Sequence, residues 1–185
     1  MQPPAITRHR RPFLAPLWIM WLLFLVAAAL VFFAYRSATT TTVVLVRHAE
    51  QELGTIEDAP LSAAGERRAE HLAQVFGDVS GPGRIDAIYV SDTRRAQQTA
   101  MPLAMRLGVR PTVLPATQVD AVVSRILHDH RGGRALVVGH SNTLPEIVQR
   151  LSGVSIPPIG GDQHDNIYVV TVPTFGKASV LQLKY

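Results

Sequence analysis

An arginine and a histidine follow an apolar run whose composition is typical of a buried strand. Thr42–Val46 is entirely β-branched or aliphatic, and Arg47 and His48 come directly after it. A strand that ends in this way places a cation and an imidazole where open α/β sheets bind their ligands. Arg8-His9 is the same dipeptide but has no strand before it. The prediction of a ligand site therefore depends on the strand that precedes Arg47 and His48.

A second apolar run also ends in a histidine. Leu136–Gly139 is followed by His140, which would lie at the same edge of the sheet if both strands are parallel. Taken alone, His140 could equally be a core histidine with satisfied hydrogen bonds at a strand end.

The elements that must position these residues alternate along residues 43–185. This alternation predicts an α/β fold, a three-layer α/β/α sandwich with a mostly parallel sheet. Ser62 is the expected N-cap of the first helix, and Pro102 is expected to kink the second helix or delay its start. Strands are predicted near 43–47, 86–91, 111–115, 134–139, 166–172 and 179–184, and helices near 62–78, 94–107, 119–130 and 143–152.

The N-terminal part of the chain differs in composition from the rest. Residues 13–35 are apolar and uncharged, and their length suits a transmembrane helix that acts as a signal anchor. This interpretation leaves a basic cytoplasmic tail over 1–12, a polar linker over 36–42 and a catalytic domain over 43–185. A cleaved signal peptide is the alternative, although the run is longer than a usual signal-peptide core and no good cleavage site follows it.

The charges flanking the apolar run predict its orientation. Three arginines precede it and Arg36 follows it, so the positive-inside rule keeps the N-terminus in the cytoplasm. We therefore expect a single-pass protein of the bacterial inner membrane with a periplasmic domain. Four of the 18 Lys and Arg lie within residues 1–36, and the rest balance the 14 Asp and Glu. The domain thus has no basic stripe for nucleic acid, and the lack of cysteine excludes disulfides and thiolate metal sites.

Four segments together resemble the histidine phosphatase superfamily, also called phosphoglycerate mutase-like. They occur in the family's order and at its spacing, and the resemblance covers nearly all of residues 43–185. The resemblance implies the predicted fold, a phosphohistidine intermediate, and a reaction that needs no metal and no cofactor. The segments are Val46–Glu50, Asp58–Gly65, Tyr89–Ala100 and Val138–Thr143.

The resemblance also implies roles for individual residues. His48 matches the nucleophile, because a neutral imidazole has a ring nitrogen with a free lone pair. Arg47 and Arg95 match the two phosphate clamps, whose planar forks suit a phosphoryl dianion. His140 matches the second histidine of the pocket, which would donate to an equatorial oxygen.

Residues beside these positions receive weaker assignments. Arg94 occupies a variable position next to Arg95 and is expected to face solvent. The backbone amides of Ser141 and Asn142 lie at the predicted start of a helix, where they could add contacts to the phosphate.

The sequence departs from the family pattern after the third strand. Many members carry a glutamate general acid there, but residues 111–120 contain none, and Asp120 is the nearest carboxylate. Asp120 is the tentative acid, or it only provides the favourable negative charge at the start of the next helix. Glu50 and Asp58 are remoter candidates. A smaller departure is Ala49, at a position where glycine is common.

These observations predict a membrane-anchored phosphomonoesterase that acts on an extracytoplasmic phosphorylated small molecule or envelope component. A phosphohistidine or phosphoprotein phosphatase is one alternative, and an inactive phosphate-binding module is another. The cluster His128-Asp129-His130 lies at a polar helix end without an evident third ligand, so we expect no metal there. The substrate and the oligomeric state stay open.

Overall fold

The computed structural model describes residues 17–38, 40–54 and 58–185. The chain forms two compact units, Met1–Tyr35 and Arg36–Tyr185, and each is described by itself. Helix α1 (Leu17–Ala38) carries an exposed 19-residue stretch, Leu17–Tyr35, that is long and apolar enough to cross a membrane. A signal sequence has the same properties. The predicted tail over 1–12 and the start of the predicted span over 13–16 lie outside the described residues.

The polar segment predicted as a linker over 36–42 is largely regular structure. Helix α1 continues to Ala38, and strand β1 (Thr40–Arg47) begins three residues earlier than predicted. The threonines at its start pair with Thr171–Pro173 of strand β5 (Asn166–Pro173). Because threonine is β-branched, it suits a strand wherever such a partner is available.

Except for a short 3-10 helix, which was not predicted, the remaining elements begin and end within two residues of their predicted bounds. Pro102 lies inside α3, which runs without a break from Arg94, so the predicted late start is wrong. The elements are α2 (Ala63–Gly77), the short 3-10 helix η1 (Gly81–Gly83), β2 (Ala87–Ser91), α3 (Arg94–Leu107), β3 (Thr112–Leu114), α4 (Val119–Asp129), β4 (Arg134–Gly139), α5 (Thr143–Ser152), β5 and β6 (Ser179–Lys184).

The six strands form one mixed sheet in the order β3-β2-β4-β1-β5-β6. The first four strands in this order pair in parallel, while β5 pairs antiparallel with both β1 and β6. The sheet is therefore mostly parallel. Since β1 and β4 are neighbours and Arg47 lies opposite Gly139, the residues that follow the two strands emerge side by side at one edge.

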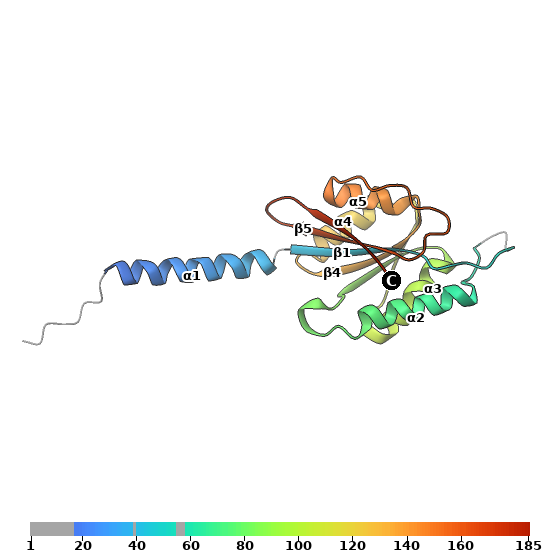
Figure 1. Ribbon diagram of the computed structural model, residues 1–185, viewed down its shortest axis with the longest axis horizontal. Helices are drawn as coiled ribbons and strands as arrows, with labels where there is room; N and C mark the ends of the chain where they lie inside the picture. Colours follow the sequence, from blue (N-terminus) through green and yellow to red (C-terminus); the bar gives the residue numbers. More distant parts are fainter. Residues whose placement is uncertain (1–16, 39, 55–57) are drawn as a thin grey trace, which may run out of the picture. The chain divides into compact units, whose positions relative to one another are not determined.

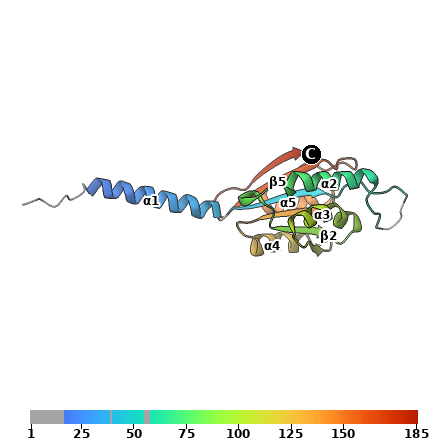
Figure 2. The same ribbon diagram turned by 90° about the horizontal axis from the view of Figure 1, so that it is seen from below.

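Helices cover both faces of the sheet, as the three-layer prediction requires. Val44 and Val46 pack with α2 and α3, whereas Val43 and Leu45 pack with α4 and α5. Successive side chains of a strand point to opposite faces, so a short apolar run can serve two cores. Figure 1 shows the two helix layers on either side of the strands, and Figure 2 shows the layer of α2 and α3 from another direction.

Candidate active site

His48 is the buried centre of the site, with 5% of its surface exposed. Its backbone N–H donates to the carbonyl of Gly139, 3.0 Å away, which continues the pairing of β1 with β4. Nδ1 of the ring lies 2.8 Å from the carbonyl oxygen of Ala49. A carbonyl oxygen only accepts hydrogen bonds, so Nδ1 carries the proton and Nε2 carries the lone pair.

The surroundings of His48 hold its ring neutral. Burial lowers the pKa of His48 to about 3, and the nearby His140, Arg95 and Arg47 act in the same direction, while the hydrogen bond to Ala49 opposes them. The imidazole is therefore unprotonated throughout the physiological range, which is the form able to attack phosphorus.

Arg47 is held by a loop far away in the sequence. Its Nη1 donates to the carbonyl oxygens of Gly160 and Gly161, at 2.6 and 2.9 Å, and more weakly to Gln163. Its Nε is buried and has no hydrogen-bond partner in the described part of the chain. A buried N–H without a partner is costly, and an anion that reached this group would offset the cost.

The start of α3 directs Arg95 into the site. Its Nε donates to Nε2 of His48 over 3.2 Å, whereas the side chain of Arg94 is exposed. Asp58, at a φ of 38°, accepts a hydrogen bond from the backbone N–H of Arg94 at 2.7 Å and so caps the helix. Thr99 connects α3 to β1, because its hydroxyl donates to the carbonyl of Arg95 and accepts from the N–H of Ala49.

His140 lies beside His48, as the register of β1 and β4 requires. The centres of the two rings are 5.2 Å apart, and 9% of the His140 surface is exposed. Burial lowers the pKa of His140, and Arg95 lowers it further. Nε2 of His140 is 2.8 Å from the hydroxyl of Ser91, the last residue of β2. Sequence reasoning gave Ser91 no role, although its place at the end of a strand was a usable signal.

His164 is a third buried histidine at the site. Its Nδ1 donates to the backbone carbonyl of His48 over 2.8 Å, and the two ring centres are 5.6 Å apart. His164 lies two residues before β5, which pairs with β1, so the topology explains its position. The sequence placed it before a strand, but gave no means of knowing that this strand would lie beside β1.

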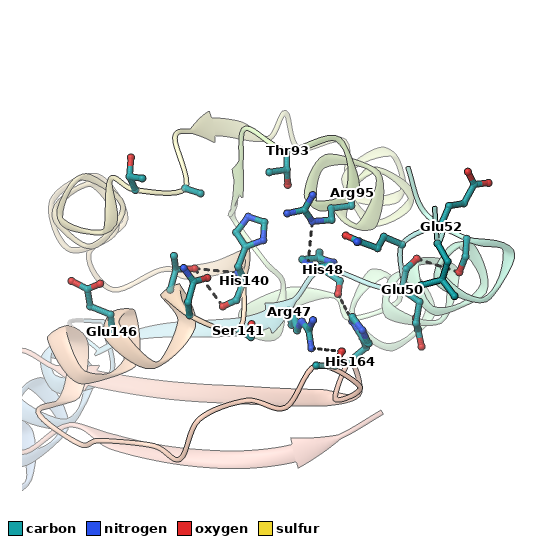
Figure 3. A pocket seen from close by; sticks show the side chains of 18 of the residues that line it. Arg47, His48, Glu50, Glu52, Thr93, Arg95, His140, Ser141, Glu146 and His164 are labelled. Carbon is teal, nitrogen blue, oxygen red and sulfur yellow. Dashed lines mark hydrogen bonds between the residues drawn. The ribbon is translucent and has the colours of Figure 1, made fainter. Parts of the chain in front are cut away.

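The side chains meet in a cavity of about 1190 Å³. Arg47, His48, Arg95 and His140 line its base, and Figure 3 shows Glu52 and Glu146 at opposite sides of it. Ser141 and Asn142 also line the cavity, just before α5 begins at Thr143. Their backbone amides are thus close enough to the helix N-terminus to favour an anion.

Asp120 is not brought into the site, which corrects its tentative assignment as the acid. Its exposed carboxylate pairs with Arg150 of α5, and it does not line the cavity. The reason is helix geometry: Val119 at the start of α4 faces the cavity and the core, so the next residue points away.

Glu50 and Asp58, the alternative candidates for the acid, also have hydrogen-bond partners within the protein. Glu50 lines the cavity, but Arg68 of α2 donates three hydrogen bonds to it, at 2.7 to 3.0 Å. These bonds lower the pKa of Glu50 and hold it ionised. Gly65 permits this approach of α2, because a Cβ there would lie 2.1 Å from the backbone oxygen of Glu50. Asp58 caps α3, as described above.

We expected no metal at His128-Asp129-His130, and the side chains of His128 and Asp129 are exposed. His128 and Asp129 pair with each other at 2.8 Å. Within residues 17–38, 40–54 and 58–185, no group of three or more His, Cys, Asp or Glu side chains is arranged to hold a metal ion.

Comparison with known proteins identifies the domain. Residues 43–118, which include Arg47, His48 and Arg95, match the model of the histidine phosphatase superfamily, branch 1. The segment that carries Arg47, His48 and Arg95 therefore matches the histidine phosphatase superfamily. The predicted reaction class, a phosphomonoesterase-type hydrolase, is thereby confirmed. His140 lies beyond the matched segment and joins the site through the pairing of β1 with β4.

Solved structures share the fold of this domain. The protein histidine phosphatase SixA in complex with tungstate is 22% identical, with a TM-score of 0.63 over 77% of this chain and 96% of its own. A putative alpha-ribazole-5'-P phosphatase from Escherichia coli is 18% identical, with a TM-score of 0.61 over 78% of this chain and 96% of its own. A mycobacterial glucosyl-3-phosphoglycerate phosphatase is 17% identical, with a TM-score of 0.58 over 79% and 98%. No curated protein matches the sequence.

Proposed function

We propose that this histidine phosphatase hydrolyses phosphomonoesters through a phosphohistidine formed on Nε2 of His48. One observation carries the proposal: the unprotonated Nε2 faces a cavity whose base presents Arg47, Arg95 and His140. A neutral nucleophile beside two guanidiniums suits attack on a phosphoryl dianion, because the cations offset the charge of the substrate.

The proposed reaction has two steps. Nε2 of His48 attacks phosphorus, and the bond to the leaving-group oxygen breaks. Arg47, Arg95 and His140 stabilise the charge on the equatorial oxygens. Water then attacks the phosphohistidine, so that the N–P bond breaks, inorganic phosphate is released and His48 is restored. Neither step requires a metal ion.

The carboxylates of the cavity bear on the substrate class. Arg68 binds Glu50, and Arg150 binds Glu146. Glu52 lies at the rim and its side chain is exposed. We propose that leaving groups that are stable without a proton, such as aryl and acyl oxygens, react faster than alkyl alkoxides. A phosphohistidine side chain is a second candidate substrate, because protonation of its other ring nitrogen lets the imidazole leave as a neutral group without an acid from the protein.

We further propose that α1 anchors the domain to the bacterial inner membrane, with the domain in the periplasm and an envelope component or small phosphorylated molecule as substrate. The apolar length of Leu17–Tyr35 and the arginines before it support this orientation. A reporter fused after Tyr185 tests it. A fusion that is active only in the exported compartment supports the proposal, and a fusion active only in the cytoplasm contradicts it.

The chemistry is tested with the full chain in detergent. A substrate panel of aryl, acyl, sugar and alkyl phosphates, together with a phosphohistidine peptide, measures kcat/KM. Acid-quenched protein is examined by mass spectrometry for phosphate on His48. We expect a labile +80 Da adduct on His48, no turnover by His48→Ala and no effect of EDTA. Binding of phosphate without turnover of any substrate would favour the inactive module, and inhibition by EDTA would contradict the metal-free mechanism.

A further inference from the structure

Ser91 is a buried hydroxyl that contacts the site from behind His140. Its Oγ lies 2.8 Å from Nε2 of His140 and 3.0 Å from Oγ1 of Thr93. Ser91 is 7% exposed and does not line the cavity, so it contacts His140 rather than a bound substrate. We propose that Ser91 is a positioning residue that donates to Nε2 of His140 and thereby fixes the ring proton on Nδ1.

The direction of this hydrogen bond follows from what each end of the ring must do. A neutral imidazole carries a single N–H, and the lowered pKa of His140 keeps it neutral. In the described part of the chain, Nδ1 of His140 has no hydrogen-bond partner, and the residue lines the cavity. A phosphate oxygen accepts hydrogen bonds, so Nδ1 can contact it favourably only as the N–H.

The opposite arrangement would weaken phosphate binding. If Nε2 carried the proton and donated to Ser91, the lone pair of Nδ1 would face the phosphoryl oxygens and repel them. Thr93 favours the proposed direction, because its hydroxyl can donate to Ser91 Oγ while that oxygen donates onward to His140. Hydroxyl hydrogens rotate to suit such a chain.

The two catalytic histidines then share one tautomer and use it in opposite ways. His48 directs its Nδ1–H to the carbonyl of Ala49 and presents the lone pair of Nε2 as the nucleophile. His140 receives the Ser91 proton at Nε2 and presents Nδ1–H as the donor. This inference rests on the proposed function, because it assigns His140 to the phosphoryl oxygens.

The test is the ¹⁵N spectrum of the histidine rings in the full chain in detergent, with His140 assigned by comparison with His140→Gln. We expect Nδ1 protonated and Nε2 unprotonated in the wild type. Ser91→Ala should shift His140 toward the Nε2–H form, raise the inhibition constant of inorganic phosphate about tenfold and lower kcat by a similar factor, the scale of one hydrogen bond. Ser91→Thr keeps the hydroxyl and should retain the wild-type tautomer.

Ser124→Ala, on the exposed side of α4, is the matched control and should change none of these quantities. A wild-type spectrum with the proton on Nε2 would overturn the assignment whether or not Ser91→Ala folds. An unchanged tautomer and unchanged phosphate inhibition in folded Ser91→Ala would also overturn it. The expected tautomer in a wild-type protein without turnover would support the role of Ser91 and overturn only the proposed function.

Discussion

Replacing Arg95 with alanine should cause a large and specific loss of activity. The Nε of Arg95 is 3.2 Å from Nε2 of His48, so a phosphoryl group on that nitrogen would lie about 4 Å from the guanidinium. At an effective dielectric constant of about 20, a unit charge at this distance contributes about 4 kcal/mol. Removal of one preorganised donor costs about 2.7–4 kcal/mol in measured cases. We therefore expect kcat/KM to fall about 10²–10³-fold.

Arg94 supplies the matched control for this substitution. Its side chain is exposed. The hydrogen bond from its backbone N–H to Asp58 is kept in Arg94→Ala. The kcat/KM of Arg94→Ala should fall less than about threefold, as expected for a surface change. Arg95→Lys keeps the positive charge but lacks the planar fork, so its kcat/KM should lie between those of the wild type and Arg95→Ala.

The assay is kcat/KM with an aryl phosphate, which reduces the contribution of leaving-group protonation, together with thermal unfolding to show that each variant is folded. Similar losses in Arg94→Ala and Arg95→Ala would mean that α3 presents a different face to the cavity. A loss below about tenfold in folded Arg95→Ala would refute the electrostatic reasoning.

Three further predictions concern single residues of the site and its surroundings. Asp120→Asn should leave aryl and alkyl phosphate turnover unchanged, because its carboxylate pairs with Arg150 outside the cavity; a loss of about 10² for alkyl phosphates alone would restore Asp120 as the acid. The ring of His48 should show no protonation in an NMR titration down to about pH 4, because burial lowers its pKa to about 3; protonation near 6.5 would mean that the ring is solvated. His164→Ala should lower kcat about tenfold at nearly constant KM, because His48 loses the donor to its backbone carbonyl; a lower unfolding temperature without a change in kcat would make His164 purely structural.

Several parts of the fold could be predicted from the sequence because their causes are local. The apolar runs before His48 and His140 are short and bounded, and both are strands in the structure. Ser62 accepts a hydrogen bond from the N–H of Gly65, as its N-cap assignment predicted. Periodicity and capping depend on residues within a few positions of each other, so sequence alone carries this information.

The composition of the site depended on pairings between distant segments. The neighbouring positions of β1 and β4 bring His48 and His140 together, while the pairing of β5 with β1 brings His164 to the carbonyl of His48. The end of a strand is a signal that Ser91 lies near the site, but only the tertiary structure shows that it contacts His140. These contacts join residues tens of positions apart, and the chain alone does not specify which strands become neighbours.

Asp120 shows the same division between sequence and tertiary structure. The sequence determined that a carboxylate lies at the start of the helix after the third strand, where either an acid or a helix-terminal charge was reasonable. Only the packing of α4 against the sheet, with Val119 toward the cavity and Arg150 of α5 nearby, decided that Asp120 points outward. The apolar face that a helix buries fixes its rotation about its axis. A polar residue on the opposite face therefore points away from the core.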